Sequence, residues 1–423
     1  MDTLRISCIT WNIETSWPEQ DLEALLGLGE ENKSRSNTQF SDFLQEVRSQ
    51  PQNVVLDALF EEPWTNSFRE VLGPYGYVRI TGERLQGIVT SIFVLRHHLP
   101  HLRNIYTAIT RTGLGGFWGN KGAVAVRFSL YGCSICIVNS HLAAHDSGFD
   151  ERCANYNTII DETVFPVTPT SHILFHDYVF WLGDLNFRLS GEATAELISK
   201  KVAENDLEWL LQRDELKKAQ ETEEAFGPLS EATIKFPPTY KYQRNSNNYD
   251  LVRRPAWTDR ILHQVHVNAY ENVRLNIDQL LYESNQDYGQ SDHKPVCAKY
   301  AIKVFSHHYE KCVTFKPVKE WFIGRPNTIK YTLDADVETS PWDYVAVFKA
   351  DFTSVHQYVT YSYVPQIENQ TNSSEQSQVN RSFQMIFNDE LVQLPGLYVL
   401  LFHSSKYSCY LGMSDPFPVH RDT

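Results

Sequence analysis

The sequence lacks several features that would place a protein in a membrane or on nucleic acid. None of its apolar runs approaches the length that spans a bilayer, and its opening residues, MDTLRISCITWNIE, lack the basic region and apolar stretch of a signal peptide. Positive charge is also scarce, because 38 Lys and Arg residues face 52 Asp and Glu residues, for a formal net charge of −14. We therefore expect a cytoplasmic protein that binds no nucleic acid and meets any anionic partner through a local basic pocket.

Motifs for several common chemistries are missing as well. The chain has no GxxxxGK[ST] loop for a nucleotide, and no Ser or Cys stands in a nucleophile-elbow setting. Its seven cysteines are scattered and odd in number, without the Cys/His spacing of a zinc site. This cysteine usage predicts reduced thiols.

Apolar, strand-like runs recur in the first part of the chain, at 4–13, 86–95, 122–131, 133–139 and 177–183. Helical stretches lie between and after them, for example at 192–211. This mixture predicts a sheet-based core with helices packed on its outside.

The character of the sequence changes near residue 303. Beyond it come short aromatic-rich strand candidates, at 328–333, 342–348, 355–364, 381–387 and 396–402. Turn residues separate these candidates and helical periodicity is almost absent, so we expect a small all-β sandwich. The sequence thus predicts two domains, 1–303 and 304–423.

Polar side chains follow several predicted strands of the first domain. Asp184 and Asn186 follow the run 177–183, and two residues of that spacing on a strand would face the same side. An Asx-type turn that caps the strand would give the same pattern. Similar endings carry Asn12, Glu46, Asn139 with His141, Asp259, and Asp292 with His293. So many in one domain favour a site, because loops at the ends of a rigid sheet commonly carry one.

These residue types limit the chemistry that the expected site can perform. Carboxylates and Asn, without clustered His or Cys, suit a hard cation such as Mg²⁺, which prefers oxygen ligands. A His beside carboxylates can act as a general acid or base, or can stabilise a developing charge. The combination predicts metal-assisted hydrolysis by an activated water.

Three long segments, FWLGDLNFR, PAWTDRIL and SDHKPV, occur in an order that resembles the signature of the inositol polyphosphate 5-phosphatases. TRTGLGGFWGNKG, NSHLAAH and FPPTYKY are similar to further segments of that family. The resemblance covers about residues 3–303 and implies the α/β four-layer sandwich of the Mg²⁺-dependent exonuclease III/DNase I-like superfamily. The rest of the chain, with EWFIGRPNTIKYTL and SPWDYVAVFKADF, resembles a SKICH domain, which implies a small all-β immunoglobulin-like sandwich.

The resemblance also implies a role for each candidate catalytic residue. Asp184 would orient and help to deprotonate the attacking water, and Asn186 would hydrogen-bond the phosphoryl oxygens. His293, paired with Asp259, would stabilise the transition state, while His141 would contact the scissile phosphate. Loss of one aligned transition-state donor typically costs about 3–4 kcal/mol of barrier, so loss of Asp184 or Asn186 should nearly abolish activity.

Metal and substrate contacts follow from the same resemblance. Asn12 and Glu46 would bind or position Mg²⁺, with Asp292 close to it. The ring phosphates would be contacted by Asn120, Lys121, Tyr240, Lys241 and Arg253. The implied reaction is Mg²⁺-dependent removal of the 5-phosphate from PI(4,5)P2, PI(3,4,5)P3 and soluble inositol polyphosphates. The SKICH-like domain would direct the enzyme to endoplasmic reticulum or plasma membranes and to protein partners.

Two departures from the family pattern leave alternatives open. The segment RSNTQFSDFLQEV before Glu46 is unusually polar, which could weaken metal binding, and Leu251 stands where relatives often have a lysine that grips the 4-phosphate. A nuclease or sphingomyelinase of the same superfamily is one alternative, but the TYKY and RRPAWTDR segments and the acidic charge argue against it. A non-catalytic adaptor is the other, and only the Glu46 region favours it.

Overall fold

The computed structural model describes residues 2–28, 38–45, 62–113, 121–266, 274–305, 310, 312–335, 337–365, 381–387 and 391–421. For Asp2 and for residues 38–45 it describes the backbone alone. Glu46, Asn120 and the polar segment 366–380 lie outside these ranges.

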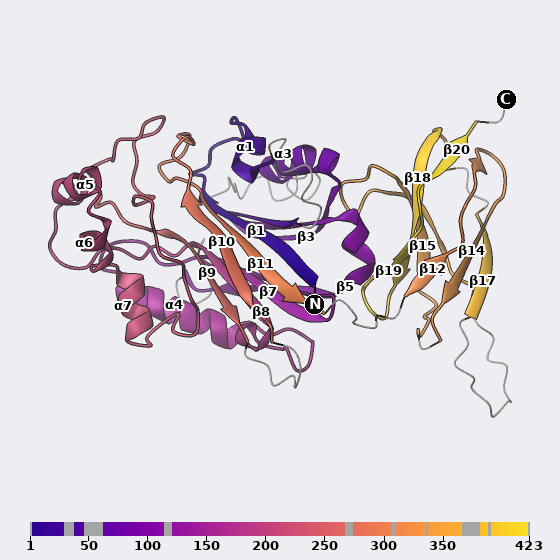
Figure 1. The fold of residues 1–423 in the computed structure, drawn as a ribbon, viewed down its shortest axis with the longest axis horizontal. Helices are drawn as coiled ribbons and strands as arrows, with labels where there is room; N and C mark the ends of the chain where they lie inside the picture. Colours follow the sequence, from indigo (N-terminus) through magenta and orange to yellow (C-terminus); the bar gives the residue numbers. More distant parts are fainter. Residues whose placement is uncertain are drawn as a thin grey trace.

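Two sheets lie face to face in the first domain (Figure 1). One sheet has the order β10-β11-β1-β2-β4-β3 and the other the order β5-β6-β7-β8-β9. The strands of the first sheet are β1 Asp2–Asn12, β2 Thr38–Gln45, β3 Tyr77–Leu85, β4 Ile88–Leu95, β10 Ile277–Ser284 and β11 Val296–Val304. Those of the second sheet are β5 Leu102–Arg111, β6 Gly122–Leu130, β7 Cys133–His141, β8 Tyr178–Asp184 and β9 Asp259–Val265.

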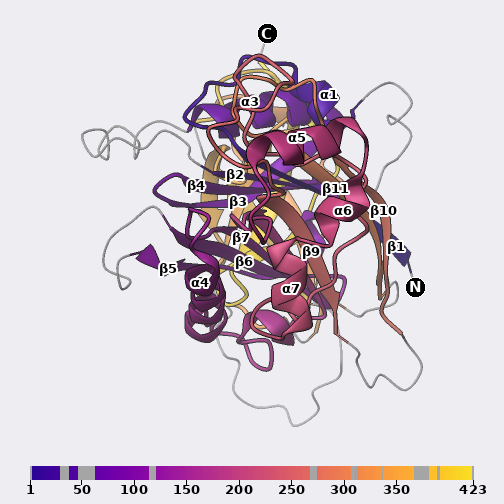
Figure 2. The same cartoon turned by 90° about the vertical axis from the view of Figure 1, so that its left-hand side faces the viewer.

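Helices cover the outer faces of both sheets, as Figure 2 shows, with α1 and α3 on one side and α4 and α7 on the other. The helical elements are α1 Leu22–Leu26, α3 Pro63–Leu72, η3 Gly73–Tyr75, η4 Arg96–His101, α4 Phe149–Glu162, η6 Ile173–Phe175, α5 Ala195–Ala203, α6 Leu207–Leu211 and α7 Glu215–Glu221. None of the helices in the described ranges is long and apolar enough to cross a membrane. The helix–sheet–sheet–helix order confirms the expected four-layer sandwich.

The run Tyr178–Leu182 of β8 is apolar because both faces of the strand are buried. All seven residues of the strand are buried. Phe180 and Leu182 belong to the core between the two sheets, whereas Val179 and Trp181 belong to the core under α4 and α7. Both faces of the strand are therefore covered, and a strand covered on both faces reads as one continuous apolar run.

Cys133 and Cys136 in β7 form a CxxC pair, the spacing of a redox motif, so the expectation that the scattered cysteines include no such pair was wrong. Cys133 lies in the core between the sheets, and Cys136 lies in the core on the opposite face of the same sheet. Residues three apart on a strand point to opposite faces, so these two thiols cannot act together. Burial raises the pKa of Cys133 to about 12.

The helical stretch expected at 192–211 is two helices, so the sequence expectation was wrong in this detail. Helix α5 ends at Ala203, and Asn205 adopts a left-handed conformation with φ +56. The side chain of Asp206 then caps α6 by accepting a hydrogen bond from the backbone N–H of Trp209 at 3.2 Å. Asn and Asp favour such turns and caps over helix interiors, which places the break here.

The second domain is a β-sandwich, as expected. One sheet has the order β12-β14-β17, and the other has the order β13-β20-β18-β15-β16 with β19 paired to β18. The strands are β12 Val313–Phe315, β13 Trp321–Phe322, β14 Asn327–Leu333, β15 Tyr344–Lys349, β16 Tyr358–Tyr363, β17 Arg381–Phe387, β18 Gly396–Ser404, β19 Cys409–Met413 and β20 Phe417–His420. Strands β14 to β18 match the five sequence candidates, whereas the other four strands have five residues or fewer and were missed.

The sandwich is joined to the first domain through a common apolar core. Phe348, Phe352 and Leu401 belong to the same buried cluster as the residues between the two sheets of the first domain. The guanidinium of Arg96, which follows β4, donates to the carbonyl oxygen of Ala350 at 2.5 Å. The backbone N–H of Arg79 in β3 donates to the carbonyl oxygen of Thr353 at 2.9 Å. The join is thus made by packing and by hydrogen bonds as well as by the covalent connection.

Candidate active site

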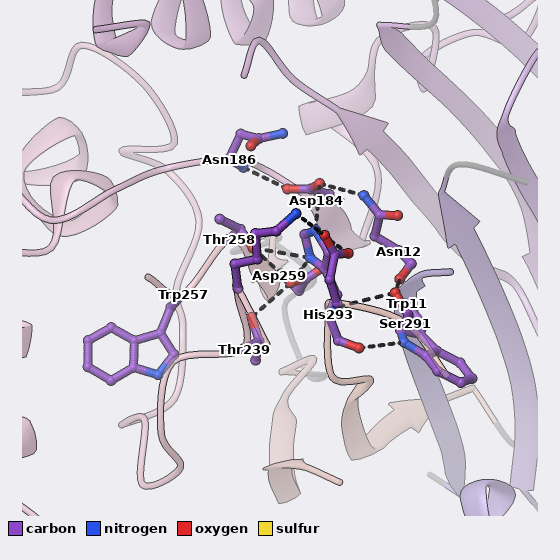
Figure 3. A network of polar contacts seen from close by, with 12 residues as sticks. Trp11, Asn12, Asp184, Asn186, Thr239, Trp257, Thr258, Asp259, Ser291 and His293 are labelled. Carbon is purple, nitrogen blue, oxygen red and sulfur yellow. Dashed lines mark hydrogen bonds and ion pairs between the residues drawn. The ribbon is translucent and has the colours of Figure 1, made fainter. Parts of the chain in front are cut away.

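Neighbouring strand ends of the second sheet place three candidate residues in one row. Asp184 ends β8, where it pairs with His141 at the end of β7 and with Asp259 at the start of β9. Asn12 ends β1 in the facing sheet, and its side-chain nitrogen donates to Asp184 Oδ2 at 2.9 Å. Asp184 therefore lies where the ends of the two sheets meet, as Figure 3 shows.

Gly183 allows β8 to approach β7 closely beside this row. Its φ of +137 is one that residues with a side chain rarely adopt. A Cβ at this position would lie 1.9 Å from the carbonyl oxygen of Ser140, well inside contact distance. The glycine of the GDLN segment is therefore required by backbone geometry directly before Asp184.

The Asp184 carboxylate is buried and strongly held. Oδ2 accepts the Asn12 amide and lies 3.2 Å from His141 Nε2, and Oδ1 accepts the backbone N–H of Asn186 at 3.1 Å. Burial alone would raise the pKa of Asp184, but the positive charges of His141, His293 and Lys121 hold that pKa well below its ordinary value. The carboxylate is thus ionised and fixed in orientation.

Asn186 reaches the site through a turn and not through strand geometry. Strand β8 ends at Asp184, and Asn186 adopts a left-handed conformation with φ +58. The bond from its backbone N–H to Asp184 Oδ1 closes an Asx turn. The expectation that the two residues share one face of a strand was therefore wrong, because the carboxylate of Asp184 itself bends the chain.

His293 pairs with Asp259, and this pair lies beside Asp184 (Figure 3). His293 Nδ1 lies 2.8 Å from Asp259 Oδ2, and the hydroxyls of Thr239 and Thr258 donate to the same oxygen at 2.8 and 2.9 Å. Burial would lower the pKa of His293, but the charge and hydrogen bond of Asp259, together with nearby Asp184 and Asp292, raise it to about 10. The imidazole is therefore held as a cation by the carboxylates that surround it.

The other ring nitrogen of His293 faces the remaining carboxylates. Nε2 lies 4.0 Å from Asp184 Oδ2 and 3.8 Å from Asp292 Oδ1. The backbone of His293 is fixed as well, because the indole N–H of Trp11 donates to its carbonyl oxygen at 3.0 Å. Beside it, the Ser291 hydroxyl donates to the carbonyl oxygen of Asn12 at 2.6 Å. These bonds join the SDH segment to the end of β1.

Three ligand-type side chains lie close enough to hold a metal ion, namely Asp184, Asp259 and His293, whose ligand atoms are all within 4.8 Å of one another. The expected oxygen ligands Asn12 and Asp292 are buried beside them. Glu46 lies outside the described residues, but the residue before it, Gln45, pairs with Asn12 in the parallel β1–β2 ladder. The described part of the polar segment before Glu46, Thr38–Gln45, is thus a strand.

Basic and aromatic side chains reach the same site from two directions. Lys121 contacts the His141 ring nitrogen, and Lys241 donates to Asp292 Oδ2 at 2.8 Å. The ring of Tyr240 lies 4.5 Å from that of His293, between centroids. Arg253 is exposed, and no described contact joins it to this group. The structure therefore brings together the expected residues Asn12, Lys121, His141, Asp184, Asn186, Tyr240, Lys241, Asp259, Asp292 and His293.

Several residues of the site were not among the candidates from the sequence. Thr239 and Thr258 hold Asp259, and Arg188 donates to the side chain of Asn186. All three stand inside the recognised segments FPPTYKY, PAWTDRIL and FWLGDLNFR, next to or near a candidate. Their position within these segments was the only sign in the sequence that they belong to the site. The residues with which they form hydrogen bonds can be identified only from the fold.

Comparisons with known proteins agree with this architecture. The family model described as Endonuclease/Exonuclease/phosphatase family 2 matches residues 9–299, and the SKICH domain model matches residues 313–419. Phosphatidylinositol 4,5-bisphosphate 5-phosphatase A of Rattus norvegicus is 33% identical over 430 residues, which cover 99% of this chain but 42% of the rat protein. This chain therefore spans less than half the length of that relative.

Two further proteins match at similar identity. Inositol polyphosphate 5-phosphatase K of Mus musculus is 30% identical over 431 residues, which cover 98% of this chain and 90% of the mouse protein. The solved inositol polyphosphate 5-phosphatase domain of SPsynaptojanin, in complex with inositol (1,4)-bisphosphate and calcium ion, is 30% identical and superimposes with a TM-score of 0.61, covering 72% of this chain and 86% of that one. With a phosphatase-family match over more than half its length and a SKICH match after it, the chain belongs to the SKICH-containing inositol polyphosphate 5-phosphatases of the endonuclease/exonuclease/phosphatase family.

Proposed function

We propose that the chain is a Mg²⁺-dependent phosphatase that removes the 5-phosphate from PI(4,5)P2, PI(3,4,5)P3 and soluble inositol polyphosphates. One observation carries the proposal: the buried Asp184 carboxylate is held by Asn12, His141 and the Asn186 backbone and faces the Asp259–His293 pair. Three groups of different chemistry thus converge on one point, as metal-assisted hydrolysis requires. An adaptor would have no need of this arrangement.

The oxygen donors at the site fit Mg²⁺. Asn12 Oδ1 and the Asp292 carboxylate are hard oxygen ligands, and Glu46 would complete the set. The group of Asp184, Asp259 and His293 fits less well, since His293 Nδ1 is already bonded to Asp259 and the same Asp259 oxygen also accepts two hydroxyls. When bound, the cation would supply positive charge to the phosphoryl oxygens.

Each side chain of the site has its own role in the proposed reaction. Asp184, fixed through both carboxylate oxygens, orients the attacking water and accepts its proton. The water oxygen bonds to phosphorus while the bond from phosphorus to the ring oxygen breaks. The ring oxygen takes a proton from solvent water, and Asp184 returns to solvent the proton that it accepted. Asn186 donates an N–H to the phosphoryl oxygens, and His293, oriented by Asp259, stabilises the charge that develops there. His141 contacts the phosphate that is cleaved.

A local basic group offsets the acidic character of the chain at the substrate. Lys121 contacts His141 and Lys241 contacts Asp292, while the ring of Tyr240 lies beside that of His293. We assign the ring phosphates to these side chains together with Arg253 and Asn120. We further propose that the protein acts in the cytoplasm and that its SKICH domain brings it to membrane surfaces and to protein partners.

The test is phosphate release from short-chain PI(4,5)P2, short-chain PI(3,4,5)P3 and soluble inositol polyphosphates, with wild type beside Asp184→Ala. We expect release that needs Mg²⁺, comes from the 5-position, stops with EDTA and is lost in the variant. Folded protein that releases no phosphate from any of these substrates would indicate an adaptor. Hydrolysis of DNA or sphingomyelin in their place would indicate another member of the superfamily.

A further inference from the structure

Arg188 holds Asn186 at two points. Its Nη2 donates to the Asn186 side-chain oxygen at 2.5 Å, and its Nε donates to the Asn186 carbonyl oxygen at 3.0 Å. Both residues are only 4% exposed, so water competes little for these bonds. The arginine lies two residues beyond Asn186 and touches none of the other proposed catalytic side chains through a described hydrogen bond.

The chemistry of a guanidinium decides which way the Asn186 carboxamide points. A carboxamide can rotate to exchange its oxygen and nitrogen, and only its hydrogen-bond partners distinguish the two states. Guanidinium is a donor at every nitrogen and accepts nothing, so it must face the amide oxygen. The amide nitrogen then points away from Arg188, where it donates one hydrogen to the carbonyl oxygen of Leu142 at 3.2 Å. Its second hydrogen remains for a phosphoryl oxygen.

Arg188 is itself fixed from two sides. Its backbone N–H donates to Glu215 Oε2 at 3.0 Å, and the same oxygen accepts Arg152 Nη2 at 2.7 Å. On the other side, the Arg188 guanidinium lies 4.7 Å from the ring centroid of Tyr240. Glu215 thus fixes the backbone of Arg188, and Tyr240 contacts its guanidinium, before any substrate binds.

We propose that Arg188 is a positioning residue that keeps the second amide hydrogen of Asn186 turned toward the phosphoryl oxygens. The inference rests on the proposed function of the same site. A donor that is oriented beforehand needs no reorganisation when charge develops, so Arg188 acts on the rate of the chemical step and little on substrate affinity. Its effect on kcat should therefore pass through Asn186, because its other side-chain contact, Tyr240, is assigned to a ring phosphate.

A double-mutant cycle tests this dependence. Arg188→Met, Asn186→Ala and the double variant are compared for kcat and KM on short-chain PI(4,5)P2 with Mg²⁺. We expect Asn186→Ala to lower kcat about 10²–10³-fold and Arg188→Met to lower it by a smaller factor, with KM within about threefold of wild type. Because Arg188 has nothing to position once the carboxamide is gone, the double variant should match Asn186→Ala within about threefold.

Two results would overturn the inference: losses that multiply in the double variant, or an Arg188→Met variant with wild-type kcat. Arg188→Lys serves as the conservative variant, since lysine also donates without accepting and should recover part of the kcat that Met loses. If thermal melting shows that Arg188→Met does not fold, the cycle is run with Arg188→Lys and judged by the same criterion. Arg213→Met, at a half-buried arginine 3.7 Å from the ring of Trp209, is the matched control and should leave kcat unchanged. A wild-type protein that releases no phosphate would instead refute the proposed function.

Discussion

At the scale of single residues, the orientation of His293 depends on one oxygen of Asp259. That oxygen accepts His293 Nδ1 and the hydroxyls of Thr239 and Thr258, while Asp259 Oδ1 is buried with no partner among the described residues. Three donors on one oxygen leave the carboxylate a single orientation. They also require a negative, purely accepting group at this position.

Asp259→Asn tests that requirement. The single oxygen of the amide could still accept the three donors, but the amide carries no charge, so it cannot hold the imidazole as a cation. We expect kcat for 5-phosphate release to fall about a hundredfold or more, with a smaller change in KM. Asp278→Asn, at an exposed carboxylate on β10, is the control and should behave as wild type. Equal activity of the two variants would exclude Asp259 from the mechanism.

At the scale of secondary structure, the β7–β8 pair determines the relative placement of His141 and Asp184. Gly183 permits the close approach of the two strands, since any Cβ there would meet the carbonyl oxygen of Ser140 at 1.9 Å. The residue also has a φ of +137. Geometry and space therefore both exclude a side chain at this point.

Gly183→Ala should consequently destabilise the protein and displace Asp184. We expect a loss of about 3 kcal/mol or more in the free energy of unfolding, because backbone strain and steric overlap add. Gly191→Ala is the matched comparison, since Gly191 has a φ of +86 but nothing lies within 4 Å of a Cβ there. That variant should lose only about 1 kcal/mol. Urea unfolding of both proteins measures the difference, and similar losses would show that strain alone accounts for the effect.

The same elements show what a sequence can and cannot reveal. The apolar run of β8 can be recognised in the sequence because both faces of the strand are buried. The Asp, Asn and His residues at strand ends can be recognised because they occur in segments that resemble those of a known family. The two-residue strand β13 is too short to show a period of two, and the break between α5 and α6 depends on local capping by Asp206. Arg188 and Thr239 are invisible as site residues because their partners come together only in the fold. The roles of the site residues stay predictions until the variants above are measured.

At the scale of the whole molecule, buried neutral histidines make stability depend on pH. His176 is buried; its Nε2 accepts from Arg127 Nε at 3.3 Å, and its Nδ1 lies 2.9 Å from the carbonyl oxygen of Ile173. Burial, with a further contribution from the charge of Arg127, lowers the pKa of His176 to about 4. Between pH 6.5 and about 4 the ring is therefore neutral in the folded protein, whereas the ring of an unfolded histidine is charged.

The sign of the effect follows from linkage. Between pH 6.5 and about 4 the unfolded chain binds a proton at His176 that the folded chain does not, so the free energy of unfolding should fall as pH falls. One such group contributes about 1.4 kcal/mol per pH unit in this window. Urea unfolding at pH 7, 6 and 5 measures the slope, and His176→Gln should make it shallower. An unchanged slope in that variant would assign the dependence to other groups.

The join between the two domains makes a separate prediction. The Arg96 guanidinium donates to Ala350 and Gly73 carbonyl oxygens at 2.5 and 3.1 Å and lies 5.9 Å from the Phe352 ring. Arg96→Met removes the side-chain donor from the half-buried Ala350 carbonyl oxygen, whereas Gly73 keeps the backbone N–H of Gly76. This loss should cost about 1–3 kcal/mol of unfolding free energy and separate the melting of the two domains. Calorimetry would show two transitions, while kcat on a soluble inositol polyphosphate should stay near that of wild type. A single transition at the wild-type temperature would show that the apolar core alone holds the join.

That common core has a consequence for how the proposed membrane-bound substrate would reach the candidate active site. A module on a flexible tether raises only the local concentration of the enzyme and leaves its catalytic unit free to tumble. Here Phe348, Phe352 and Leu401 are buried in the same cluster as residues of the strands that carry the candidate site residues. A surface that bound the β-sandwich would therefore also set the distance and the angle at which the candidate active site faces that surface.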